Sequence, residues 1–146
     1  TRLNLRPHVC GLRGKRGVTL FSAADIEAHI GSDERVYLLD FSRAWPPVTP
    51  SPSVRNGFLY QMFRPEFVTK LKNPLCPDAY SAFCSADPRA REYAREIDEA
   101  TDILMNRTIP KFAKDVSYLI LQATQESHNL NKFELTEKMH SRGINM

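Results

Sequence analysis

Asp40 is the residue whose type and position most directly suggest chemistry. It follows a nearly continuous apolar run at 36–39 and lies three residues before Arg43. A carboxylate at the end of a buried strand can hold a metal ion or act as a base. It can equally pair with Arg43 or accept backbone N–H groups in the turn before the prolines at 46–47. Both the chemical and the structural interpretation stay open.

A second group of side chains carries zinc-type donors. His8, Cys10 and His29 supply nitrogen and sulfur, and Asp25 and Glu27 alternate with His29 along the chain. These residue types bind zinc, and a cysteine beside a histidine can act as a nucleophile with its base. No fixed ligand spacing joins them. The pattern therefore predicts no metal ligand, no catalytic residue and no cofactor.

The positive charge of the chain is local. The net charge is +3, from 20 basic and 17 acidic residues, but residues 1–17 hold five basic residues and no acid, which leaves 15 basic against 17 acidic residues, or −2, elsewhere. The five are Arg2, Arg6, Arg13, Lys15 and Arg16. With the glycines at 11, 14 and 17 they predict a flexible loop that contacts RNA phosphates or is simply solvated. The loop matches no nucleotide-binding fingerprint.

Length and composition favour one soluble globular domain over residues 1–146, with 42% hydrophobic and 25% charged residues. No apolar run approaches the roughly 20 residues needed to span a bilayer, and the first residues do not resemble a secretory signal. We therefore expect no membrane insertion. The 3 cysteines have no close pairing, which favours a reducing compartment.

The elements that must position these residues change in type along the chain. Residues 1–45 are predicted to be mainly strands, 46–57 a proline-rich loop and 58–146 mainly helices. Segments 8–12 and 18–21 form a hairpin, 22–30 favours a strand over a capped helix, and 36–41 is expected to be a strand covered on both faces. The fold class is α+β, with an N-terminal antiparallel sheet of three or four strands and a C-terminal helical subdomain.

The helical half shows one clear amphipathic pattern. Asp87 and Pro88 open a helix whose apolar positions recur at spacings of three and four, at Ala90, Tyr93, Ile97, Ala100 and Leu104. A second helix is expected to start near Pro110 and to bury Phe112, Val116, Leu119, Ile120 and Ala123. A third contains Leu135 and Met139 and stops at Gly143. Segment 58–71 reads as helical with an interruption at Pro65, and its aromatics at 58, 60, 63 and 67 suit either a core or a base-stacking surface.

Four ordered blocks carry a family resemblance, at residues 22–31, 35–47, 63–68 and 139–146. In this order they resemble the Clu (clustered mitochondria) domain family. The polar residues within the blocks are Asp25, Glu27, His29, Asp40, Arg43, Arg64, Glu66, His140, Arg142 and Asn145. Ala28 stands where many relatives have glycine, the proline loop diverges, and the last block normally runs on beyond Met146. We therefore expect a fragment of a Clu-like domain.

The resemblance implies a noncatalytic binding or scaffold domain of a larger cytoplasmic protein. Family members are associated with mitochondrial distribution and with binding messenger RNA, and contact protein partners through the rest of the polypeptide. The resemblance implies no enzymatic activity.

Two other interpretations concern Asp40. In the first, the Asp40 segment belongs to a kinase-like nucleotide-binding or phosphotransferase fold, active or decayed, although the sequence shows no phosphate loop, strand lysine or catalytic-loop asparagine. In the second, Asp40, Arg43, Arg64 and Glu66 form an internal salt-bridge network. The network predicts that Asp40→Ala costs several kcal/mol, because a buried partner would lose its counter-charge.

Overall fold

The four strands form two separate hairpins. The computed structural model describes residues 3–11, 16–125 and 132–145. In it β1 (His8–Cys10) pairs antiparallel with β2 (Val18–Leu20), and β3 (Glu27–Ile30) pairs antiparallel with β4 (Val36–Leu39). The α+β class and the hairpin between the first two strands are confirmed. The strands make two two-stranded sheets instead of one larger sheet.

Short helical turns lead into a long helical half. They are the 3-10 turn η1 (Gly57–Leu59), helix α1 (Pro65–Val68) and the 3-10 turn η2 (Ala82–Cys84). Helices α2 (Ala90–Ile103), α3 (Ile109–Gln125) and α4 (Lys132–Ser141) follow. Pro65 begins α1 instead of interrupting a longer helix, as suits a residue that has no N–H to donate.

Helices α2 and α3 are one continuous helix, and not two helices with a break before Pro110. The π-helical segment η3 (Leu104–Thr108) joins them, and the N–H of Ile109 reaches back five residues to the carbonyl of Leu104. A proline inside an α-helix removes one i to i−4 hydrogen bond and crowds the preceding turn. The wider turn absorbs that conflict, so Pro110 is accommodated without ending the helix.

The core lies where α2 crosses the N-terminal half of the chain. Its centre is the predicted α2 stripe, with Tyr93, Ile97, Ala100 and Leu104 buried. Phe63 and Phe67 stack against each other, with ring centroids 5.1 Å apart, and both are buried in this core. The core interpretation of these two aromatics is therefore confirmed. On α3, Phe112 packs against the core, but Ile120 is 51% exposed and the expected burial there is wrong.

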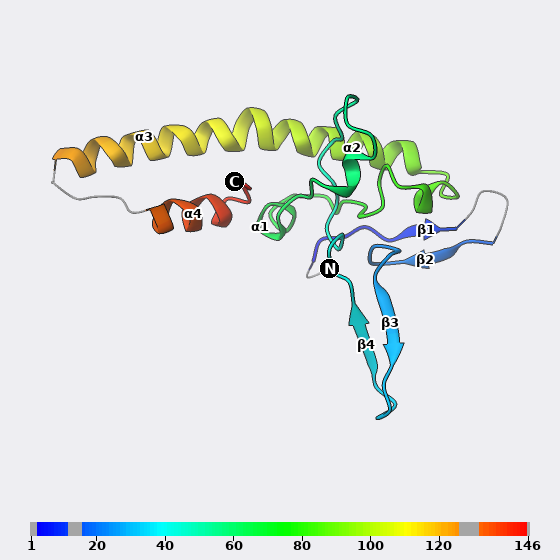
Figure 1. Ribbon diagram of the computed structural model, residues 1–146. Coiled ribbons are helices and arrows are strands. Elements are labelled where there is room, and N and C mark those ends of the chain that lie inside the picture. Colours follow the sequence, from blue (N-terminus) through cyan, green and yellow to red (C-terminus); the bar gives the residue numbers. More distant parts are fainter. Residues whose placement is uncertain (1–2, 12–15, 126–131, 146) are drawn as a thin grey trace.

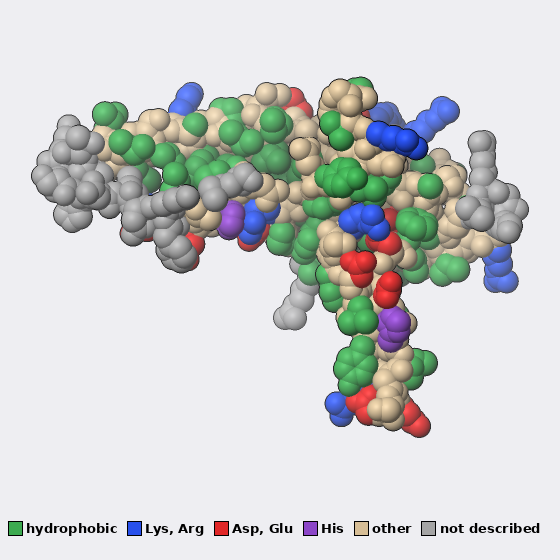
Figure 2. All heavy atoms as spheres, viewed as in Figure 1, with side chains coloured by type: hydrophobic (Ala, Val, Ile, Leu, Met, Phe, Trp, Pro, Cys, Tyr) green, Lys and Arg blue, Asp and Glu red, His purple; other side chains and the backbone are tan. Residues whose placement is uncertain are grey.

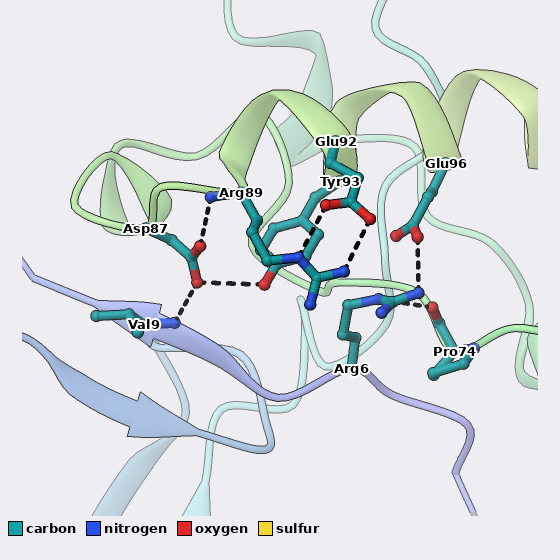
Figure 3. A network of polar contacts seen from close by, with 8 residues as sticks. All are labelled: Arg6, Val9, Pro74, Asp87, Arg89, Glu92, Tyr93 and Glu96. Atoms are coloured by element: carbon teal, nitrogen blue, oxygen red, sulfur yellow. Dashed lines mark hydrogen bonds and ion pairs between the residues drawn. The ribbon is translucent and has the colours of Figure 1, made fainter.

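A polar network attaches β1 to the start of α2 (Figure 3). One Asp87 oxygen accepts the N–H of Arg89 at 2.7 Å, and the other accepts the N–H of Val9 at 2.7 Å. Arg6 forms an ion pair with Glu96 at 2.7 Å and also donates to the carbonyl of Pro74. Asp87 thus holds the turn before α2 and fixes the first strand, but the N-cap of α2 is Arg89 and not Asp87 as its position predicted.

The β3–β4 hairpin projects away from this body (Figure 1). All eight of its strand residues are exposed. The expectation that segment 36–41 is covered on both faces is therefore wrong for the described chain. The apolar run at 36–39 forms one strand of a solvent-exposed hairpin and not a central strand of a larger sheet.

None of the described helices has both the length and the apolar character needed to cross a membrane.

Candidate functional site

The projecting hairpin has one face of apolar side chains only and one mixed face, on which Glu27 lies opposite Leu39 and His29 lies opposite Tyr37. In its register Ala28 lies opposite Leu38, and Ile30 lies opposite Val36. Directly opposed residues of an antiparallel pair share a face, so these four side chains form a single surface, here called the apolar face. Ile30 is 79% exposed, Val36 65% and Leu38 53%. The apolar face packs on nothing among the described residues.

The opposite face carries hydrogen bonds between polar groups. His29 and Glu27 are linked at 3.0 Å, and the Tyr37 hydroxyl donates to Asp33 at 2.8 Å. That bond lowers the pKa of Asp33 and raises the pKa of Tyr37. The two faces of the hairpin therefore differ in polarity, as they do in a sheet with one face packed on a core. In the described chain, both faces of this hairpin are exposed.

The hairpin is acidic. Residues 25–40 contain five acidic residues and one basic residue, which gives a formal charge of 1 − 5 = −4. In Figure 2 the green apolar side chains of the hairpin lie between red carboxylates near its base and its tip. Such a surface repels phosphate groups and attracts cationic ones.

An ion pair closes the base of the hairpin. The guanidinium of Arg43, which follows β4, binds the carboxylate of Asp25, which precedes β3. The pair lines a cavity of about 170 Å³ together with Asp78 and apolar side chains such as Phe58 and Met62. Arg43 is thus paired with Asp25, and not with Asp40.

Asp40 lies in an exposed turn. Its backbone has a φ of 54°, and its carboxylate accepts the hydroxyl and the N–H of Ser42. These two bonds lower the pKa of Asp40. The expectation of a carboxylate at the end of a buried strand is wrong, because Asp40 is exposed.

The proposed four-residue salt-bridge network is divided into separate pairs. Arg64 binds Glu66 through two hydrogen bonds of 3.0 and 2.9 Å, which lower the pKa of Glu66. Arg43 binds Asp25 instead, and Asp40 bonds only locally. The network interpretation is therefore wrong, since no hydrogen bond or ion pair joins these pairs within the described residues.

The C-terminal block packs back onto α1. Asn145 donates to the carbonyl of Met62 at 3.1 Å, and Gly143 lies directly against Phe67. His140 is near enough to lower the pKa of Glu66 further. Arg142 pairs with Asp115 of α3 at 3.4 Å. The third and fourth blocks of the family resemblance therefore lie side by side.

Arg142 also lines a cationic groove. The groove has a volume of about 450 Å³, and its lining includes four cations above an apolar floor. The cations are Lys70, Arg107, Lys111 and Arg142. This groove was not predicted, because its cations come from three segments that only the fold brings together.

The predicted phosphate-binding residues fall into different settings. Arg6 is bound to Glu96 and Pro74, and its side chain is 16% exposed. Arg16 is exposed. Arg2, Arg13 and Lys15 lie outside the described residues.

Two of the predicted zinc-type donors meet a third residue that sequence reasoning missed. His8 Nε2 lies 2.7 Å from Asp78 Oδ2, and Cys10 Sγ lies 3.6 Å from the same oxygen. His29 belongs to the other hairpin and binds Glu27 instead. Asp78 stands among Leu75, Cys76, Pro77 and Ala79, so its apolar surroundings were the available signal that it is buried.

The electrostatics of this cluster favour protonated groups. Burial lowers the pKa of His8, but its bonds to Asp78 and to the Arg6 carbonyl outweigh burial and raise the pKa overall. Burial and the nearby Asp78 raise the pKa of the Cys10 thiol to about 12. Cys10 is therefore a thiol at neutral pH, which does not suit a nucleophile.

Comparison with known families addresses the N-terminal third of the chain. Residues 1–49 match the family model CLU, Clustered mitochondria. This part of the chain is Clu-like. The matched range contains both hairpins and the Asp25–Arg43 pair. The family resemblance is therefore confirmed for residues 1–49, which include the projecting β3–β4 hairpin. No curated protein and no solved structure matches the chain.

The CLU match also covers the apolar face of the hairpin. Ala28, Ile30, Val36 and Leu38 all fall within the matched residues. The cationic groove, in contrast, lies outside them.

Proposed function

We propose that the chain is a noncatalytic binding module of a Clu-like protein that serves mitochondrial distribution through a protein contact. The apolar face of the β3–β4 hairpin is the contact surface. Its partner presents an apolar surface bordered by lysine or arginine side chains. A cytoplasmic location goes with this proposal and is itself a prediction.

The uncovered apolar face carries the proposal. A lone two-stranded hairpin is at best marginally stable in water, and a second layer packed on its apolar face stabilises it. Scattered exposed apolar residues need no explanation, but here three large ones share one face of one short sheet. A partner that covers Ile30, Val36 and Leu38 would supply the missing layer.

Charge supports a protein partner at this surface over RNA. The hairpin region has a formal charge of 1 − 5 = −4 over residues 25–40. Phosphate backbones are repelled by such a field, whereas a cationic rim on a protein is attracted and oriented by it. The hairpin and its carboxylates therefore fit a basic, apolar protein surface.

Site-specific photo-cross-linking tests the proposal. A photoreactive amino acid is placed at Val36 on the apolar face or, as the matched control, at Tyr37, its neighbour on the opposite face. After irradiation in cells, Val36 should give an adduct with one protein that resists ribonuclease and is displaced by excess unlabelled chain. Equal adducts from both positions, no adduct, or an adduct with RNA or with a second copy of the chain would overturn the proposal.

RNA binding is the second candidate function, and the cationic groove is the observation that favours it. Arg107 and Lys111 are exposed and lie one turn apart, and Lys70 lines the same groove. Phosphates bind such clusters, and the affinity falls steeply with salt. This candidate places RNA on the helical half, away from the acidic hairpin.

A paired substitution tests the RNA candidate. Arg107→Gln with Lys111→Gln should weaken binding of single-stranded RNA and reduce the slope of log affinity against log salt by about 1.4, at roughly 0.7 per lost phosphate contact. Arg91→Gln with Arg95→Gln removes the same charge from the exposed side of α2 and is the control. Equal losses in both pairs would reject the groove as the RNA site.

A further inference from the structure

Two donors on one face of β1 meet a carboxylate from a distant segment. His8 and Cys10 are two residues apart in a strand, so their side chains leave the same face. Asp78 is separated from them by 70 and 68 residues and comes from the loop before η2. One nitrogen, one sulfur and one oxygen from these residues lie within 4.8 Å of one another.

We propose that His8 Nε2, Cys10 Sγ and Asp78 Oδ2 bind a zinc-class divalent cation. The mixed donor set determines the class of metal. Imidazole and thiolate ligands favour zinc or cobalt, whereas magnesium and calcium take oxygen ligands. Three protein ligands leave the fourth tetrahedral position to water or another small ligand.

The sulfur and oxygen donors are already spaced for a tetrahedral ion, and the nitrogen is close enough to join them after a small shift. With Zn–S near 2.3 Å and Zn–O and Zn–N near 2.1 Å, tetrahedral angles place sulfur and oxygen about 3.6 Å apart and nitrogen and oxygen about 3.4 Å apart. The observed separation of Cys10 Sγ from Asp78 Oδ2 is 3.6 Å. His8 Nε2 is 2.7 Å from the same oxygen, so the ring and the carboxylate must separate by about 0.7 Å.

The surrounding bonds orient the ligands as metal sites require. His8 Nδ1 lies 3.2 Å from the Arg6 carbonyl, which only accepts, so Nδ1 carries a proton and Nε2 faces the other donors. The N–H of Ala24 donates to Asp78 Oδ2 at 2.8 Å and holds the carboxylate in place. Both are the outer contacts that fix metal-binding histidines and carboxylates.

Charge and access also fit a divalent cation. Binding releases to solvent the protons that Cys10 Sγ and His8 Nε2 hold in the metal-free chain. The neutral imidazole, thiolate and carboxylate then carry −2 together, so a divalent cation makes the buried site neutral. Asp78 lines the cavity of about 170 Å³ and Cys10 is partly exposed, so an ion can approach through these two donors, while His8 is buried behind them. Bound metal would cross-link β1 to the loop before η2.

Cobalt titration of the purified, reduced chain tests the site. Cobalt(II) should bind with a stoichiometry of one and show the thiolate-to-cobalt charge-transfer band together with the intense visible bands of tetrahedral cobalt. Cys10→Ser should abolish the charge-transfer band and weaken zinc binding at least about 10-fold. Zinc, but not magnesium, should raise the thermal midpoint of the parent chain.

Two controls keep the result interpretable. His29→Gln removes the exposed histidine beside Glu27, and Cys84→Ala removes a buried thiol that is not among the three donors. Both should keep the charge-transfer band. A folded parent chain without the band, or a band that survives Cys10→Ser, would overturn the proposal, and circular dichroism establishes that each variant is folded.

Discussion

Asp25 and Arg43 form an ion pair that joins the two ends of the β3–β4 hairpin. Asp25 lies just before β3 and Arg43 just after β4, so the pair closes the hairpin at its base. The side chains are 18% and 34% exposed respectively, which places the pair between surface and interior. It ties the two stems of the projecting element together, while the N–H of the neighbouring Ala24 donates to Asp78 at 2.8 Å and links the first stem to the body.

The first prediction concerns this pair. Asp25→Asn and Arg43→Gln should each destabilise the hairpin, and a double-mutant cycle should give a coupling of about 0.5–1 kcal/mol, because solvent screens a partly exposed pair. Urea unfolding measures the global effect, and hydrogen exchange of the β3 and β4 amides measures the local one. A coupling near zero would show that the two residues do not act together.

The second prediction concerns Asp40. Since its carboxylate is exposed and, among the described residues, bonds to Ser42 alone, Asp40→Ala should destabilise the chain only slightly, mainly because alanine is strained at a φ of 54°. Asp40→Gly should cost less, because glycine adopts positive φ freely. Chemical denaturation of both variants checks the order. A loss of several kcal/mol for both would restore the buried interpretation of this carboxylate.

The third prediction concerns pH. Burial, with help from Glu92 and Glu99, raises the pKa of Glu96 despite Arg6 and Arg89, which lower it. One Glu96 oxygen is buried without a hydrogen-bond partner. Because the pKa of Glu96 is higher in the folded than in the unfolded chain, the folded chain binds more protons between these two pKa values. The contribution of Glu96 to the free energy of unfolding therefore falls as pH rises from about 4.5 through the folded-state pKa.

Glu96→Gln removes this titration. The free energy of unfolding of the variant should lack the fall with pH that Glu96 causes in the parent chain. At pH 7 the variant should be at least as stable as the parent chain. Thermal or urea unfolding between pH 4 and 7 measures the difference between the two stability curves. A difference that does not change with pH would contradict the raised pKa. Glu137→Gln, which removes an exposed carboxylate of α4, is the control.

The fourth prediction concerns Gly143, which follows α4. Its φ is 78°, and an added Cβ would clash with the Cβ of Phe67 and lie 2.6 Å from the backbone nitrogen of the same residue. Gly143→Ala should therefore destabilise the chain by at least about 2 kcal/mol, from strain and overpacking together. Denaturation checks the magnitude. A loss below about 0.5 kcal/mol would mean that the C-terminal block does not pack on α1 as described.

Local patterns in the sequence predicted the elements that depend on nearby residues. The α2 stripe through Tyr93 and Ile97 follows from helical spacing, and the hairpin of β1 and β2 follows from two short apolar segments around a glycine-rich loop. The joining of α2 and α3 was missed, because Pro110 signals a helix start and its accommodation by a π turn depends on context.

Partners across long separations could not be read from the sequence. Arg43 had Asp40 as its nearest acid in the chain, but the register of β3 and β4 brings Asp25 to it. Asp78 reaches His8 across 70 residues, and no spacing rule connects them. The apolar run at 36–39 was correctly read as a strand, but periodicity does not say what covers it.

The most direct test of the protein-binding account compares the two faces of the hairpin. The test variant carries Ile30→Thr, Val36→Thr and Leu38→Thr, and the control carries His29→Thr, Tyr37→Thr and Leu39→Thr on the other face. Calorimetry measures their affinity for the protein that cross-links through Val36. Because the test side chains are exposed in the free chain, folding stability should change by less than about 0.5 kcal/mol.

The test variant should bind the partner protein about 100-fold more weakly than the parent chain, a loss of about 2.7 kcal/mol, because buried apolar anchors dominate such contacts. The control should bind within a few-fold of the parent chain. Equal affinity of the two variants for the partner would contradict the assignment of Ala28, Ile30, Val36 and Leu38 as the binding surface.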